Sequence, residues 1–200
     1  MSSTNTLIED CFIRTQDDSL YVNGLAIRRT VLWNDANGSS FVMSSLPQLA
    51  GRTLVVEYCD VIYSRAKWHH WSGGRVFDMR GEGGGAAGTG VIFSNINIED
   101  PRPTLQQFFI CMTMPKPYSK DALKGPAGNL SGILFQNITI AAPSVLGEPH
   151  ILWGQADARI RKLTFENLTL AGKAVQRSEF FKVNEFVDQL IFAPGVTPKP

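Results

Sequence analysis

The segment Ile133-Leu-Phe-Gln-Asn-Ile-Thr-Ile140 alternates apolar and polar residues, with an asparagine near its middle. An alternation of period two predicts a β-strand with one face turned toward a core. Two close copies of this segment are Val91-Ile-Phe-Ser-Asn-Ile-Asn-Ile98 and Leu163-Thr-Phe-Glu-Asn-Leu-Thr-Leu170. Their similarity indicates a repeated structural unit rather than three unrelated strands.

Weaker copies of the same pattern extend along most of the chain. Their matching apolar residues are Ile8, Ile27, Val56, Phe93, Phe135 and Phe165, followed by a degenerate copy over residues 187–192. The steps between the six matched residues are 19, 29, 37, 42 and 30 residues long. Between successive copies lies a second strand-like run, at residues 19–22, 40–43, 75–79, 107–112, 150–153 and 179–183. Each repeat is therefore expected to carry at least two short strands and loops of variable length.

The expected fold is all-β, a single-stranded parallel β-helix of about six to seven coils over residues 1–193. Each coil would hydrogen-bond to the next and add its apolar residues to one continuous core. A sandwich or propeller is disfavoured because only two tight-turn dipeptides of the Asn-Gly or Asp-Gly type occur, Asn23-Gly24 and Asn37-Gly38. The absence of a convincing amphipathic helix in the sequence disfavours α/β folds. Residues 194–200 are expected to form a disordered tail.

The composition is that of a globular domain, with 200 residues, 44% hydrophobic, 18% charged and a net charge of +1. No basic patch suggests nucleic acid as a partner, and no apolar run approaches the roughly 18 residues of a membrane span. The three cysteines match no zinc pattern. Cys11 and Cys59 fall within strand-like runs and are expected to be small buried apolar residues. No metal and no cofactor is expected.

The asparagines at 95, 137 and 167 occupy the same place in three copies. In stacked coils such residues can form a ladder of side-chain amides from one coil to the next. Asn137 and Asn167 also begin Asn-X-Thr sequons, so glycosylation is the alternative interpretation. His150 precedes a predicted strand and is expected to be structural.

The densest chemical signal is Arg14-Thr-Gln-Asp-Asp-Ser-Leu-Tyr-Val22. Glycoside hydrolysis uses two carboxyl groups, one protonated and one ionised. Asp17 and Asp18 would point to opposite faces of an extended strand, so both can reach one cleft only at a bend or a strand end. A plain Asp-Asp turn at the surface is the other interpretation of this pair.

The run from Leu7 to Val22 resembles the Asp-Asp coil of glycoside hydrolase families 28 and 49, the polygalacturonases and the dextranase/isopullulanase group. The segments at residues 29–33 and 55–65 are more similar to family 49. The resemblance covers about Thr4 to Asp100. It implies a right-handed parallel β-helix that hydrolyses a polysaccharide with inversion. It also implies that Asp17 is the general acid and that Asp18 is one of the carboxylates that activate water.

Two departures from the family pattern qualify this resemblance. A third aspartate of the families would lie just before Met1, so Met1 is expected to be an internal start or an artificial boundary. The Gly-His-Gly segment of family 28 is replaced by residues 34–40, which contain no histidine, and this disfavours polygalacturonase. The intact parent is expected to be secreted or periplasmic, although this chain contains no signal peptide.

Several polar and aromatic residues are predicted to line a glycan groove beside the aspartate pair. They are Asp35, Asn37, Trp68, His69, Trp71, Arg75, Asp78 and Arg80. Tryptophan faces stack on sugar rings, while the polar side chains bond sugar hydroxyls. Loop-capping roles are the alternative for the tryptophans, and a plain loop role is the alternative for Asp35 and Asn37.

The leading functional hypothesis is an inverting endo-glucanase of the dextranase type, or an incomplete fragment of one, that binds a polysaccharide or oligosaccharide. A polysaccharide lyase is an alternative that would require clustered carboxylates for calcium. A non-catalytic glycan-binding β-helix is another, because a fold by itself does not give a function. An exposed coil edge at the N-terminus also predicts self-association.

Overall fold

The computed structural model describes residues 6–22, 25–35, 38–43, 53–64, 76–80, 90–99, 109–112, 129–141, 150–175 and 181–194. Over these ranges the regular secondary structure consists of β-strands, in two sheets that are mostly parallel. The prediction of an all-β chain is confirmed. No helix in the described ranges is long and apolar enough to cross a membrane.

The first sheet is formed by the repeated segments. Its main path runs β1 (Thr6–Glu9), β4 (Leu25–Arg28), β7 (Leu54–Ser64), β9 (Val91–Ile98), β11 (Leu130–Ile140), β13 (Ile160–Leu170) and β14 (Lys173–Ala174). Three further strands join this sheet: β2 (Phe12–Thr15) pairs β5 (Val31–Asn34), which pairs β7, and β16 (Val187–Ala193) pairs β13. All described pairings are parallel except that of β13 with β14.

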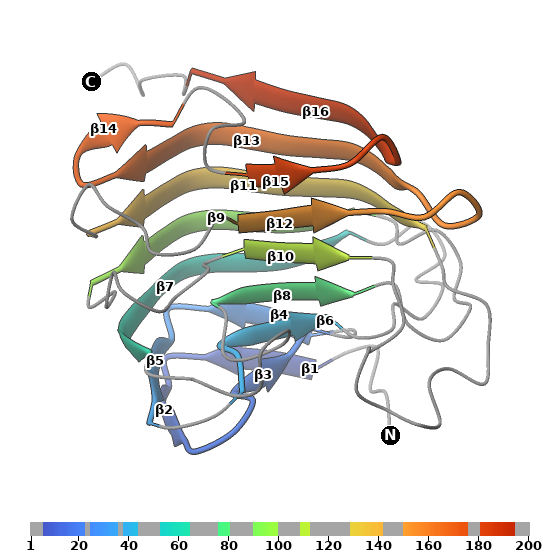
Figure 1. Ribbon diagram of the computed structural model, residues 1–200. Helices are drawn as coiled ribbons and strands as arrows, with labels where there is room; N and C mark the ends of the chain where they lie inside the picture. The colour runs from blue at the N-terminus through green and yellow to red at the C-terminus, as the bar shows by residue number, and fades with distance from the viewer. Residues whose placement is uncertain are drawn as a thin grey trace.

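The second sheet is formed by the runs between the repeats. Its strands are β3 (Leu20–Tyr21), β6 (Phe41–Met43), β8 (Phe77–Arg80), β10 (Phe109–Met112), β12 (His150–Trp153) and β15 (Phe181–Val183), neighbouring one another in chain order. Figure 1 shows that the chain passes alternately through the two sheets. The second-sheet arrows β8, β10, β12 and β15 point to the right, whereas the first-sheet arrows β9, β11, β13 and β16 point to the left. Each return to a sheet therefore adds a strand beside the previous one.

The strand register follows the spacing of the sequence repeat. One continuous column of paired residues consists of Ile8, Ile27, Val56, Phe93, Phe135, Phe165 and Phe192. The first six are the residues that the repeat alignment matched. The seventh lies in the degenerate copy. The predicted steps between repeats are therefore confirmed.

The core lies between the two sheets and contains a stack of phenylalanine rings. The ring of Phe135 is stacked between those of Phe93 and Phe165, with centroid distances of 5.1 and 5.0 Å. Phe77 of the second sheet meets Phe135 edge to face at 5.1 Å. Burying each such ring contributes roughly 1.5–3 kcal/mol, so aligned apolar positions hold the sheets together.

Successive passages through the first sheet, from β1 to β13, bend at one shared register position. The bend residues are Asp10, Arg29, Tyr58, Asn95, Asn137 and Asn167, all with φ between +48° and +54°. They follow one another in register, one per passage through the sheet. Such a residue turns the strand and shifts its alternation, so that Phe93 and Ile96 are both buried across the bend. These bends are a feature that the alternation alone did not reveal.

The predicted asparagine ladder is confirmed at the last three bends. Asn137 Nδ2 donates to Asn95 Oδ1 at 3.0 Å, and Asn167 Nδ2 donates to Asn137 Oδ1 at 2.9 Å. Asparagine is also among the residues that adopt a positive φ most readily. The nitrogen atoms in this ladder are those to which a glycan would be attached, so the ladder competes with glycosylation at Asn137 and Asn167.

The expectation for the cysteines is correct for Cys59 and wrong for Cys11. Cys59 is buried, and burial raises the pKa of its thiol to about 11. Cys11 lies in the same register column, next to Thr30, but it is exposed. It belongs to the end strands, where no further described strand covers the column. The side chain of Cys111 and the tail at 195–200 lie outside the described residues.

Candidate functional site

The two candidate catalytic aspartates lie at the bend between β2 and β3, where the chain crosses from the first sheet to the second. Asp17 is exposed and Asp18 is half-buried. Asn34 Nδ2 donates to the Asp17 carbonyl oxygen at 2.8 Å, and Thr15 Oγ1 and Ser19 Oγ lie 2.7 Å apart beneath the bend. Two neighbouring aspartates were expected to reach one cleft only at a bend or a strand end. Asp17 and Asp18 lie at such a bend.

Gly38 packs directly on the peptide that joins the two aspartates. Its φ is +76°, and a Cβ added there would lie 2.1 Å from Asp18 N and 2.5 Å from the Asp17 carbonyl carbon. Real Cβ atoms do not approach backbone so closely, so only glycine fits without movement. The next passage of the chain therefore packs against the Asp17–Asp18 peptide and limits how far this peptide can move toward Gly38.

The Asp18 carboxylate is held by donors from two passages of the chain. Tyr21 Oη donates to Asp18 Oδ2 at 2.6 Å, and the Ser39 N–H donates to Asp18 Oδ1 at 2.8 Å. The Asp18 N–H in turn donates to Asp17 Oδ1 at 2.8 Å. Both Asp18 oxygens thus serve as hydrogen-bond acceptors, so the position of this carboxylate is fixed by two donors.

Asp78, one of the predicted substrate contacts, belongs to the same group. It lies in β8 with 1% of its surface exposed, and Ser39 Oγ donates to Asp78 Oδ2 at 3.2 Å. Ser39 therefore joins the carboxylates of Asp18 and Asp78. Sequence analysis did not predict Ser39 or Gly38 as site residues. Both lie in the replaced family segment at 34–40, and Gly38 was noted only as part of the Asn37-Gly38 turn dipeptide.

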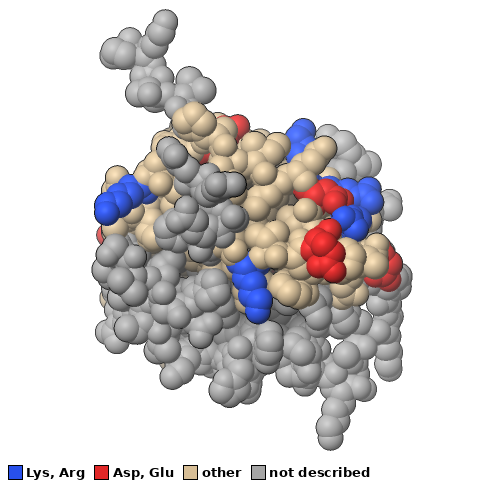
Figure 2. All heavy atoms as spheres, turned by 45° about the horizontal axis from the view of Figure 1, so that its top comes forward, with Lys and Arg blue, Asp and Glu red and all other residues tan. Residues whose placement is uncertain are grey.

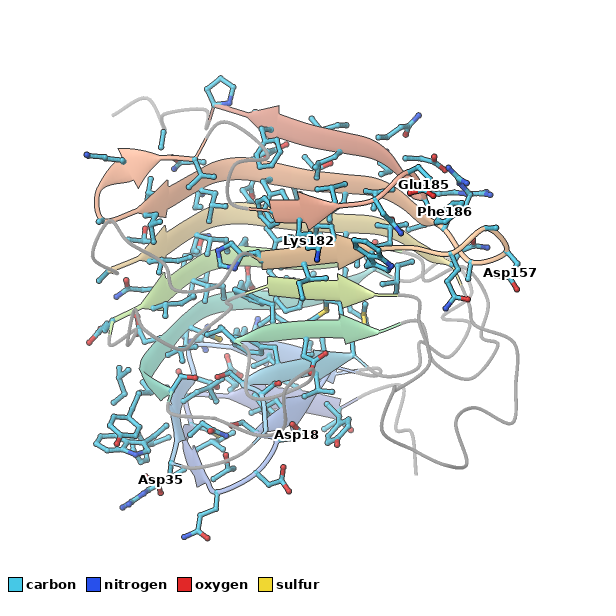
Figure 3. All side chains as sticks on the ribbon, viewed as in Figure 1. Asp18, Asp35, Asp157, Lys182, Glu185 and Phe186 are labelled. Atoms are coloured by element: carbon cyan, nitrogen blue, oxygen red, sulfur yellow. The ribbon has the colours of Figure 1, made fainter. Side chains whose placement is uncertain are left out.

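Asp35 belongs to a different group, in which both of its oxygens are occupied. Arg14 Nε donates to Asp35 Oδ2 at 2.7 Å, and Trp33 Nε1 donates to Asp35 Oδ1 at 2.6 Å. The hydrogen bond from Arg14 holds the pKa of Asp35 below its usual value. Trp33 stacks on Tyr63 at 4.5 Å, with the Arg14 guanidinium 5.5 Å from the Trp33 ring. Asp18 and Asp35 lie at the same end of the sheets, but they have different partners (Figure 3).

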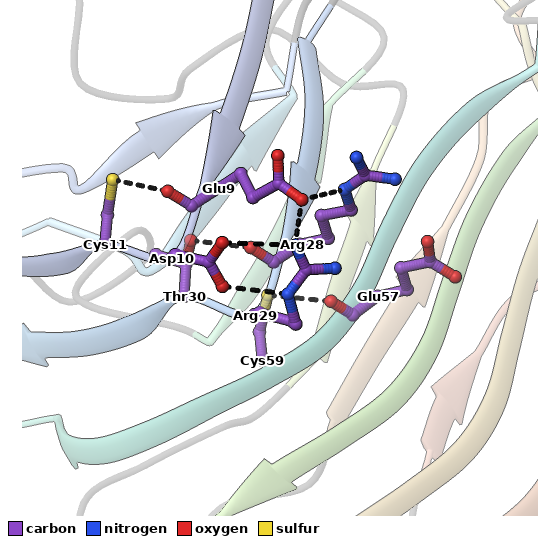
Figure 4. Close-up of polar contacts among 8 residues, drawn as sticks. All are labelled: Glu9, Asp10, Cys11, Arg28, Arg29, Thr30, Glu57 and Cys59. Carbon is purple, nitrogen blue, oxygen red and sulfur yellow. Dashed lines mark hydrogen bonds and ion pairs between the residues drawn. The ribbon is translucent and has the colours of Figure 1, made fainter.

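A charged cluster that sequence analysis missed lies on the first sheet (Figure 4). Arg28 Nε donates to Glu9 Oε1 at 2.7 Å, and Arg29 Nε donates to Asp10 Oδ1 at 2.8 Å. Arg29 also contacts Glu9. Asp10 and Arg29 are the first two bend residues, so an ion pair links the bends here as amides do further along. Acids and bases match in number, and partly exposed pairs contribute little free energy. This cluster is therefore structural.

The opposite end of the sheets has a different character. Figure 2 shows that the described residues of this face are mostly uncharged, with acidic and basic side chains mixed toward the right and further basic side chains at the left and near the centre. Arg159 and Asp188 pair at 2.6 Å, and this contact lowers the pKa of Asp188. A cavity of about 510 Å³ at this end is lined by Asn167, Leu168, Ala174, Val175, Phe192, Ala193 and Pro194. No acid or base is among these described lining residues, so they offer no proton transfer.

Most of the predicted glycan contacts cannot be compared with the geometry. Asn37, Trp68, His69, Trp71 and Arg75 lie outside the described residues, as does the side chain of Arg80. Their roles stay predictions. Within the described part of the chain, no three His, Cys, Asp or Glu side chains gather closely enough to hold a metal ion.

Known proteins supply no further guidance to this site. A scan of the sequence against protein-family models finds no match, and a search of curated proteins finds none. The function therefore has to be argued from the geometry of Asp17, Asp18, Ser39 and Asp78.

Proposed function

We propose that the chain forms a single-stranded, right-handed parallel β-helix of about six to seven coils. The repeated register supports this proposal, because each return to either sheet adds one parallel strand beside the last. The bend column supports it too, since a residue of positive φ recurs at the same register position in successive passages. A right-handed β-helix is expected because crossover connections between parallel strands of one sheet are almost always right-handed.

On this scaffold the proposed activity is hydrolysis of a polysaccharide with inversion, by an endo-glucanase of the dextranase type similar to glycoside hydrolase families 28 and 49. The observation that carries it is the fixed aspartate pair. Asn34, Gly38 and Ser39, all from the following passage, contact the Asp17–Asp18 peptide or the Asp18 carboxylate. A plain surface turn would not require such support.

The two aspartates would have different roles. Asp17 is the exposed member and would act as the general acid that protonates the leaving oxygen. Asp18 accepts hydrogen bonds at both oxygens and would act as a carboxylate that activates water. The remaining proposed substrate contacts are Asp35, Asn37, Trp68, His69, Trp71, Arg75, Asp78 and Arg80. The protein would be secreted or periplasmic.

Reducing-sugar release from dextran, pullulan and polygalacturonate tests the activity. We expect release from dextran, a loss of at least about 100-fold in Asp17→Asn, and no effect of EDTA, because a general acid contributes about 10²–10⁴-fold. Asp60→Asn, a change of the same kind in β7, is the control and should be neutral. Equal rates for wild type and Asp17→Asn would rule out this role for Asp17. A calcium requirement with an unsaturated product would instead indicate a lyase.

Self-association through the β1–β3 end is part of the proposal. Three of the exposed large apolar side chains lie on these end strands: Leu7, Phe12 and Tyr21, at 48%, 61% and 48% exposure. An unpaired strand edge with exposed apolar residues favours pairing with another chain. Phe12→Lys should shift the sedimentation of a concentrated sample toward monomer. An unchanged distribution for this variant would argue against this interface.

A further inference from the structure

Ser39 bridges two carboxylates that come from different passages of the chain. Its N–H donates to Asp18 Oδ1 at 2.8 Å, and its hydroxyl donates to Asp78 Oδ2 at 3.2 Å. Its carbonyl oxygen accepts from the Ser19 N–H at 2.8 Å. Asp18 precedes β3, Ser39 precedes β6 and Asp78 lies in β8, so three consecutive strands of the second sheet contribute.

Asp78 is a buried residue in a register column of the second sheet that ends at the exposed Tyr21 and Lys182. Its register partners are Val42 in β6 and Ile110 in β10, and the next strand continues the column with Ile151. Asp78 is 1% exposed and Val42 is 4% exposed. Burying a carboxylate costs free energy unless hydrogen bonds compensate, and the Ser39 hydroxyl supplies one such hydrogen bond.

We propose that Asp78 is a positioning residue that acts on Asp18 through Ser39. This inference rests on the proposed function and deepens it by giving the buried Asp78 a positioning role in place of a direct contact with the substrate. By accepting a hydrogen bond from the Ser39 hydroxyl, Asp78 anchors Ser39 in the position from which its backbone N–H donates to Asp18 Oδ1. Tyr21 holds the other Asp18 oxygen. A misplacement of about 1 Å in a reacting group can cost about 10²-fold in rate.

Three variants separate positioning from a purely structural role. Asp78→Leu matches the aliphatic neighbours and removes the acceptor, Asp78→Asn keeps an acceptor oxygen of the same shape, and Ser39→Ala removes only the hydroxyl. On dextran we expect Asp78→Leu and Ser39→Ala to lower kcat by about tenfold or more, with KM within about twofold. Asp78→Asn should retain most of kcat. The double variant should be no worse than Asp78→Leu alone, because both changes break one link.

The control is Asp60→Asn, which should leave kcat and KM unchanged. Melting temperature is measured for every variant, so that a loss of activity can be compared with any loss of folded protein. A wild-type kcat in Asp78→Leu would overturn the inference. A loss of activity that follows only a loss of folded protein would also overturn it.

A second readout does not depend on activity toward any glycan. The side-chain carboxyl carbons are labelled with ¹³C, and the Asp18 resonance is compared between wild type and variants at one pH. We expect this resonance to move in Asp78→Leu and in Ser39→Ala, and to stay in place in Asp60→Asn. A protein that hydrolyses nothing but shows this pattern would contradict the proposed function while supporting the link. An unmoved Asp18 resonance in both variants would overturn the link.

Discussion

Replacing Gly38 by alanine is expected to disturb the aspartate pair more than its small size suggests. The residue has φ +76°, and an alanine with this φ costs about 1–2 kcal/mol relative to the common backbone regions. The new Cβ would also lie 2.1 Å from Asp18 N, whereas ordinary contacts begin at 3.4 Å. The Asp17–Asp18 peptide or the Gly38 loop must therefore move by more than about 1 Å.

Two consequences follow for Gly38→Ala. The free energy of unfolding in urea should fall by more than the 1–2 kcal/mol of the backbone term alone. Among molecules that remain folded, kcat/KM on dextran should fall by about 100-fold, because the carboxylates are displaced by about 1 Å.

Gly172→Ala is the matched control. Gly172 has φ +74° and no atom within 4 Å of an added Cβ, so it carries the same backbone cost without the collision. It should lose about 1–2 kcal/mol of stability and no activity. If both variants lost the same stability and both kept activity, the contact of Gly38 with the aspartates would not position them, and the reasoning would be refuted.

Three further predictions concern the bends, one ion pair and the thiols. Tyr58→Asn should raise the free energy of unfolding in urea by about 1 kcal/mol, because asparagine tolerates the positive φ of this exposed bend and can extend the amide ladder. A free energy of unfolding below that of the wild type would contradict this prediction. The pKa of Asp35 is lowered by Arg14, so its stabilising effect is present above an unfolded pKa of about 3.9 and is lost as pH falls through the lower folded value. Urea titrations of Asp35→Asn and wild type should differ at neutral pH and converge below about pH 4; a gap that persists in acid would argue against the pair. In a Cys111→Ser background, a thiol reagent should modify exposed Cys11 quickly and buried Cys59 only on unfolding; equal rates would contradict the burial.

The strands were predictable because their determinant is local. The alternation around Phe93, Phe135 and Phe165 repeats within each copy, and aligning the copies is enough to obtain the register. The asparagine ladder followed from the same alignment. The bends at Arg29 and Tyr58 were not predictable, because neither residue type favours a positive φ. There the stacking of neighbouring strands overrides the local preference.

The site was predictable only in part, for a related reason. Asp17 and Asp18 stand out by residue type and by adjacency. Gly38 and Ser39 contact them across about one coil, and such a contact depends on loop geometry that no short pattern encodes. Asp78 was predicted as a sugar contact, whereas its burial beside Ser39 became visible only in the assembled sheet. The exposure of Cys11 likewise depends on its place at the end of the stack.

The most direct test of the central claim is a time-resolved proton NMR experiment on dextran digestion, which reports the anomer that is released first. An inverting hydrolase acting on this α-linked glucan through Asp17 should release the β-anomer first, and Asp17→Asn should release almost none. First release of the α-anomer would contradict inversion. Equal release by Asp17→Asn, or no release by the folded wild-type chain, would contradict the assignment of the aspartate pair as the catalytic carboxyl groups.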